Sequence, residues 1–98
     1  METQEKKVQV KKETKQEINE IFDTLEKLKS KKNEVREESK KEYEKKIQEL
    51  EAKKKDLKSR YDEIENATEE RWNEISEAVN ESSKDFKKGF SKLREAIS

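Results

Sequence analysis

The chain contains neither cysteine nor histidine, and these two absences remove the usual routes to catalysis and metal binding. Without cysteine there is no disulfide framework, no thiol nucleophile and no cysteine-built metal site. Without histidine, the commonest general base and metal ligand is missing. Carboxylates are abundant, but acid–base catalysis requires one that is desolvated in a cleft. We therefore predict that the protein is not an enzyme and has no catalytic residues, cofactor or metal.

Apolar residues are also scarce. They make up 27% of the 98 residues, whereas charged residues make up 51%. Such a chain has too little apolar surface to surround a globular core, for which about half of the residues are usually apolar. No apolar run is long enough for a signal peptide or a membrane span, so we expect a cytoplasmic protein. Proline is absent and Gly89 is the single glycine, which favours long helices.

Net charge is absent too, because 25 basic residues balance 25 acidic ones. Intrinsic disorder is typical of chains with low hydrophobicity and a large net charge, and this chain has only the first property. Nucleic-acid binders usually carry a large positive charge on one face. Here acidic residues separate the lysine runs at 40–41 and 53–55. The balance indicates a folded helical protein that binds no nucleic acid.

The apolar residues that are present recur at alternating gaps of three and four, which places them on one stripe of an α-helix. Beyond Leu50 the columns repeat every eleven residues, and they pass through residues 66–69 without a change of phase. Eleven residues fit three helical turns almost without drift. We call the following eighteen residues the apolar stripe and predict that they form the seam of an oligomer: Ile18, Ile21, Leu25, Leu28, Val35, Tyr43, Ile47, Leu50, Leu57, Tyr61, Ile64, Trp72, Ile75, Val79, Phe86, Phe90, Leu93 and Ile97.

The predicted fold is all-α, with a long amphipathic helix from about Glu13 to Ile97 that assembles as a homo-oligomeric coiled coil. Residues 1–12 are predicted to form a mobile N-terminal arm, and residues 13–98 a single helical coiled-coil region. The alternative is an antiparallel hairpin or bundle with a turn near Asn66, since Asn66 and Glu69 have the spacing of a capping box. Residues 30–33 are a second place where the helix could bend.

Charge is distributed in blocks along the chain. Residues 27–60 contain 14 basic and 8 acidic residues, a net charge of +6. Residues 61–81 carry a net charge of −7, and residues 84–94 one of +4. Blocks of this size favour antiparallel alignment of basic with acidic segments, within one chain or between two.

The second half of the chain resembles a known class of protein. Tyr43-x3-Ile47-Gln-Glu-Leu50, followed by Trp72-x2-Ile75-x3-Val79 and by Phe86-x2-Gly89-Phe90, is similar to small bacterial coiled-coil proteins of the cyanobacterial stress-response type, some of which have apolipoprotein-like names. Ser83 stands where that pattern has a second tryptophan. The resemblance implies a stress-associated helical protein without enzymatic activity, and it provides no functional residues.

Two functions are compatible with these observations. The first is a structural or scaffolding coiled coil, stress-associated, that acts through helix–helix contacts with itself or with a partner helix. The second is a lipid-surface protein, because Trp72, Phe86 and Phe90 share one face while Lys84, Lys87, Lys88, Lys92 and Arg94 lie off it. We favour the first, since acidic residues surround Trp72 and are unsuited to an anionic membrane surface.

Overall fold

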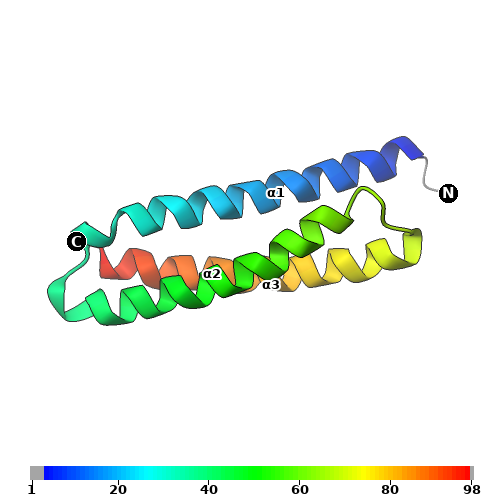
Figure 1. The fold of residues 1–98 in the computed structure, drawn as a ribbon. Helices are drawn as coiled ribbons and strands as arrows, with labels where there is room; N and C mark the ends of the chain where they lie inside the picture. Colours follow the sequence, from blue (N-terminus) through cyan, green and yellow to red (C-terminus); the bar gives the residue numbers. More distant parts are fainter. Residues whose placement is uncertain (1–3, 98) are drawn as a thin grey trace.

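Residues 4–97 fold as three α-helices that lie side by side, each packed against the other two (Figure 1). This computed structural model describes residues 4–97, and it describes side chains from Val10 onward. The three helices are α1 (Gln4–Ser30), α2 (Lys40–Glu63) and α3 (Glu69–Ala96). Helix α2 runs antiparallel to α1 and α3 (Figure 1). Their Cα atoms span 54 × 18 × 17 Å. The all-α prediction is confirmed, and the chain takes the folded-back form that was the alternative.

The predicted continuous helix from Glu13 to Ile97 is wrong, and its first interruption follows Ser30. Two short 3-10 turns, Lys32–Glu34 and Glu37–Ser39, flank an extended residue, Val35, with φ −76° and ψ 139°. Residues 36–39, between Val35 and the start of α2, contain no apolar side chain, so no packing of apolar groups favours a helix there. Val35 nonetheless remains buried and pairs with Ile97 in an isolated antiparallel bridge.

The second interruption lies at residues 64–68, which confirms the turn expected near Asn66 but not its cap. Thr68, rather than Asn66, caps α3, and its Oγ1 accepts a hydrogen bond from the backbone N–H of Arg71 at 3.2 Å. Glu69 and Glu70 occupy the first turn of α3, where a carboxylate interacts favourably with the helix dipole. Thr68 satisfies one of the free N–H groups at the start of the helix, so the chain can restart there in a new direction.

The apolar stripe lies inside this single chain. Fourteen of its residues are buried, and the other four (Ile47, Tyr61, Trp72 and Ile97) are partly buried against the same core. The core runs along the bundle axis, with Phe86, Ile18, Leu25, Leu57 and Ile75 fully covered. The stripe therefore needs no second chain to cover it, and the physical reason for predicting an oligomer through these residues disappears.

Gly89 lets α2 and α3 approach closely. A Cβ atom built at this position would lie 3.0 Å from Leu50 Cδ2 and 3.1 Å from Leu50 Cδ1. Real Cβ contacts are rarely so short, so the missing side chain makes room for Leu50, which is 2% exposed. Glycine is less favourable in a helix than alanine, but here it allows the two helices to pack closely against each other.

The N-terminal segment differs from the predicted arm, because α1 begins at Gln4 rather than at Glu13. Of the twelve residues assigned to that arm, residues 1–3 lie outside the described part of the chain. The Lys11 ammonium donates a hydrogen bond to the carbonyl oxygen of Ala67 at 3.4 Å, and it lies 5.9 Å from the centre of the Trp72 ring. These two contacts tie the beginning of α1 to the turn between α2 and α3.

Candidate interaction surface

The outward face of α3 carries a row of charged residues at helical spacing. Their sequence gaps alternate between three and four, apart from one repeated four, so they follow one side of the helix opposite its buried face. All of them are exposed. We call them the charged stripe: Glu70, Glu74, Glu77, Glu81, Lys84, Lys88, Lys92 and Glu95.

Charges of one sign are grouped along the charged stripe. Four glutamates come first, three lysines follow, and Glu95 ends the row. Neighbours four residues apart therefore often repel each other, as at Glu77 and Glu81 or at Lys84 and Lys88. Each such like-charge pair destabilises a helix by about 0.2–0.5 kcal/mol. The grouping places acidic residues toward the N-terminus of α3 and basic residues toward its C-terminus. The helix dipole stabilises such charges only in the first and last turns, so it does not account for the residues in the middle of the row.

Most of the charged stripe has no ion-pair partner. Within residues 10–97, Glu77, Glu81, Lys84, Lys88 and Lys92 make no side-chain hydrogen bond or ion pair. Glu74 is the exception, because its carboxylate lies 2.8 Å from the Arg71 guanidinium. The exposed charges of this face therefore meet mainly solvent, with few opposite charges of the protein beside them.

On α1 and α2, some of the charges pair with a neighbouring segment of the chain. Lys29 Nζ lies 3.0 Å from Glu51, and Lys15 Nζ lies 2.5 Å from Glu65. The hydrogen bond from Lys15 lowers the pKa of the Glu65 carboxyl, and the hydrogen bond to Glu51 raises the pKa of Lys29. Each exposed pair contributes little to stability, about 0–1 kcal/mol. Other exposed lysines of these two helices, such as Lys27, Lys41 and Lys55, have no ion-pair partner among the described residues.

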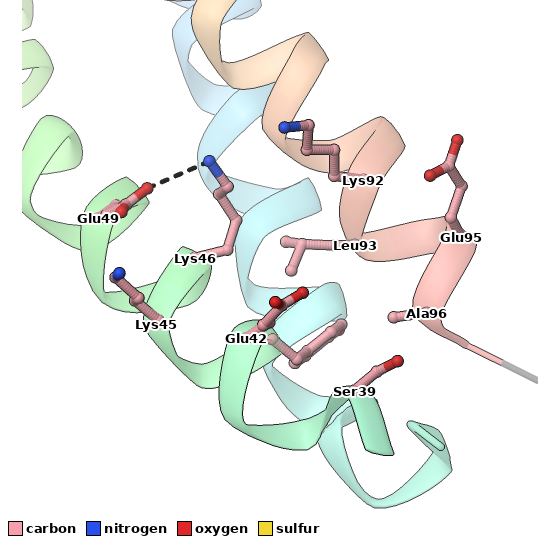
Figure 2. Close-up of a pocket in the computed structure, with 10 residues that line it drawn as sticks. Ser39, Glu42, Lys45, Lys46, Glu49, Lys92, Leu93, Glu95 and Ala96 are labelled. Carbon is pink, nitrogen blue, oxygen red and sulfur yellow. Dashed lines mark ion pairs between the residues drawn. The ribbon is translucent and has the colours of Figure 1, made fainter. Parts of the chain in front are cut away.

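A groove of about 510 Å³ lies between the beginning of α2 and the end of α3 (Figure 2). Tyr43, Leu93 and Ala96 provide its apolar part, and charged side chains surround them. The remaining lining residues are Ser39, Glu42, Lys45, Lys46, Glu49, Lys92 and Glu95. Its residues Lys92 and Glu95 also belong to the charged stripe, so the groove extends this surface toward α2.

Electrostatics in the groove are mixed. Lys46 Nζ lies 3.1 Å from Glu49, and its hydrogen bond lowers the pKa of the Glu49 carboxyl. Lys92 extends from α3 beside this pair and has no partner of its own among the described residues (Figure 2). Lysines of α2 and α3 therefore share this end of the bundle. The predicted antiparallel match of basic with acidic segments is not found here.

Among residues 10–97, one polar residue is buried in the core. Ser83 is 4% exposed, and its Oγ donates a hydrogen bond to Glu17 Oε1 at 2.8 Å. This position follows Tyr61 and Trp72 in the eleven-residue column, and it is where the resembling proteins have a second tryptophan. A hydroxyl group is accommodated at this position because the carboxylate of Glu17 on α1 accepts its hydrogen bond. The bond links α1 to α3 at this level of the bundle.

The residues behind the lipid hypothesis are mostly enclosed. Phe86 is 0% and Phe90 4% exposed, and the centres of their rings lie 5.7 Å apart. Trp72 is partly buried beneath Lys11. Contact of this face with lipid therefore requires α3 to separate from the other two helices. No helix in the described residues combines the length and apolarity needed to span a membrane.

The described residues also contain no group of three acidic side chains arranged to hold a metal ion. Sequence reasoning placed the functional residues on the apolar stripe, and it did not identify the charged stripe. A signal was present, since residues 61–81 and 84–94 were recognised as blocks of opposite charge. Testing the charges for helical spacing, as was done for the apolar residues, would have identified the row.

Comparisons of the chain with protein-family models, with curated proteins and with solved structures found no match. The resemblance to bacterial stress-response coiled-coil proteins therefore stays a prediction.

Proposed function

We propose that the protein is a non-enzymatic scaffolding protein that acts through helix–helix contacts made by the outward face of α3. The observation that carries this proposal is the charged stripe, a row of exposed charges at helical spacing that is grouped by sign and largely unpaired. A second helix laid along α3 meets these charges at every turn. The three-helix core makes the face rigid, so little ordering is required on binding.

Rigidity of α3 comes from its buried side. Ile75, Val79, Phe86 and Leu93 are all at most 2% exposed, so the helix cannot rotate or slide without uncovering apolar surface. The charges on its outer side are therefore held in fixed register. Fixed register is what allows an arrangement of charges to distinguish one partner from another.

The test is site-specific photocrosslinking in the living cell, with two matched positions. Ser91 lies beside the charged stripe on α3, whereas Ser59 lies on the outer side of α2, and both are exposed. A photoreactive residue at Ser91 is expected to form a discrete protein adduct, and the same residue at Ser59 is expected to form none. Adducts of equal yield at both positions, or none at Ser91, would contradict the proposal.

Lipid binding is the competing function, and Trp72 reports on it directly. Because Trp72 is partly buried under Lys11 and touches the core, opening of the bundle onto a membrane changes its surroundings. The scaffolding proposal predicts no change in Trp72 fluorescence when anionic vesicles are added. A blue shift that depends on vesicle concentration would favour the lipid-surface function instead.

The cytoplasmic location and the link to stress remain predictions, the first from the sequence and the second from the resemblance. Both are checked by following the abundance and location of the tagged protein before and after osmotic or oxidative stress. If the abundance of the protein does not change with stress, the predicted link to stress is contradicted.

A further inference from the structure

We propose that the partner of the charged stripe is a second copy of the same chain, bound antiparallel so that the two α3 helices lie side by side. This inference rests on the proposed function, because it names the partner of the same surface. Between Glu74 and Lys92, the arrangement of charge on α3 is complementary to itself when reversed.

The complementarity follows from the numbering of the stripe. The change from acid to base falls between Glu81 and Lys84. A twofold axis that crosses α3 near residues 82 and 83 places Glu81 opposite Lys84 of the second copy. The same axis places Glu77 opposite Lys88 of the second copy, and Glu74 beside its Lys92. At the two ends of the stripe Glu70 falls opposite Glu95 of the second copy, so the match of opposite charges extends from Glu74 to Lys92. Each contact occurs twice, as in any twofold dimer whose partners use the same patch.

Parallel pairing is excluded by the same arrangement. It would set glutamates against glutamates and lysines against lysines along the row, and like charges brought together across an interface are strongly unfavourable. The antiparallel dimer instead relieves the repulsion between neighbours such as Glu77 and Glu81 by giving each an opposite charge. A long acidic or basic molecule cannot do this, because it matches one half of the stripe and repels the other.

Such a dimer depends on salt, since its contacts are exposed ion pairs without an apolar centre. The Debye length falls from about 20 Å at low ionic strength to about 4–5 Å near 0.5 M. We expect the dissociation constant to rise at least about tenfold between ~20 mM and ~500 mM salt. Helix content should stay the same across this range, because the apolar core lies within each chain.

Charge reversal on the full-length chain is the test, with sedimentation equilibrium at low salt as the measurement. The variant Lys84→Glu/Lys88→Glu has an all-acidic stripe from Glu70 to residue 88, and Glu77→Lys/Glu81→Lys gives the opposite change. Each variant alone is expected to be monomeric. An equimolar mixture of the two, and the fourfold variant that exchanges all four charges, are both expected to dimerise like the parent chain.

The matched control is Lys41→Glu/Lys55→Glu, which makes the same change in charge on exposed positions of α2. It is expected to dimerise as the parent does, and circular dichroism should show equal helix content in every variant. Dimerisation of the two stripe variants alone, or failure of the fourfold variant to restore it, would overturn the inference.

A distance measurement tests the orientation. Spin labels at Ser91 in both copies should lie about 25 Å apart along the axis in the antiparallel dimer, because each label is about 8.5 residues from the twofold axis. A separation under about 15 Å would indicate parallel pairing and overturn the inference. A parent chain that stays monomeric at low salt would also overturn it, while the Ser91 photoadduct, formed with a different protein, would leave the proposed function standing.

Discussion

Residues on the two faces of α3 have nearly the same helical spacing, but one face is buried and the other is exposed to solvent. Ile75, Val79, Phe86 and Leu93 on the inner face are covered by α1 and α2. Glu77, Glu81, Lys84 and Lys88 on the outer face meet water, and among the described residues they meet no opposite charge. Regular spacing thus indicates that residues share one face of a helix, and burial shows which face contacts the other helices of the same chain.

The comparison also separates the energies that each face contributes. Burying an apolar side chain contributes about 1.5–3 kcal/mol, whereas an exposed ion pair contributes about 0–1 kcal/mol. The inner face therefore decides the fold, and the outer face is free to vary in charge at little cost to it. We therefore expect substitutions on the inner face to change the free energy of unfolding, and substitutions on the outer face to change association with another molecule.

The largest expected effect is at Phe86, which is fully buried. Phe86→Ala should lower the free energy of unfolding by about 3–5 kcal/mol, because it removes a large buried ring and leaves a cavity. Urea unfolding followed by circular dichroism measures the loss. Lys88→Ala on the outer face is the control and should change the free energy by less than about 0.5 kcal/mol. Equal effects at the two positions would contradict the assignment of the faces.

Substitution of Gly89 tests how closely α2 and α3 pack against each other. Gly89→Leu should destabilise the bundle by about 1–3 kcal/mol, since its side chain must displace Leu50. In a chain that already carries Leu50→Ala, the same substitution should cost much less, because the space that Leu50 filled is available. Thermal and urea unfolding of the four chains gives the coupling between the two sites. Additive effects would show that α2 and α3 do not meet at this point.

Thr68 tests where α3 begins. Thr68→Ala should cost about 1 kcal/mol, because the N–H of Arg71 loses its side-chain acceptor. Asn66→Ala, two residues earlier, should have a smaller effect, since Asn66 lies in the turn rather than at the cap. The free energies of unfolding of both variants distinguish the positions. The reverse order would restore Asn66 as the cap that the sequence predicted.

The smallest expected effect is a pH dependence at Tyr43, whose hydroxyl donates a hydrogen bond to the carbonyl oxygen of Leu28. Burial, with a contribution from Glu34, raises the pKa of the Tyr43 hydroxyl. The folded state thus holds this proton more tightly than the unfolded state, whose tyrosine pKa is about 10. The resulting stabilisation is complete below that pH and is lost as the pH rises through the folded pKa.

Tyr43→Phe should therefore show a weaker loss of stability at alkaline pH than the parent, although it is less stable at neutral pH. Unfolding free energies measured from pH 8 to about pH 11 give the comparison. Tyr61→Phe, a change to a partly buried tyrosine of the same helix, is the control. Identical alkaline slopes for the Tyr43→Phe variant and the parent would contradict the effect of burial.

Much of the fold could be predicted from the residues alone. Composition and spacing predicted an all-α protein, and the residues expected on the apolar stripe are the residues of the core. The path of the chain could not be predicted in the same way. Ile64, the C-cap residue of α2, and Ile75 of α3 are in phase on either side of the turn, and both are buried in one core. The number of residues in this turn keeps the columns in phase, so continuity of phase does not show continuity of a helix.

The two interruptions differ in how visible they are. Near Thr68, residues suited to a helix cap stand between two amphipathic segments, and a turn was a stated alternative. Around Val35 the apolar spacing continues, and only the polar run that follows indicates a break. Val35 is buried because it packs beneath the end of α3 and pairs with Ile97, a contact between residues far apart in sequence. Such contacts are decided by the closure of the whole bundle and not by local preference.

The central claim is that one chain closes its own apolar stripe, and small-angle X-ray scattering at high salt tests it most directly. Under these conditions the account predicts the mass of a single chain and a compact rod consistent with Cα extents of 54 × 18 × 17 Å. A multimer with a longest dimension near ~130 Å, the length of an unbroken helix of about 85 residues at 1.5 Å per residue, would contradict it.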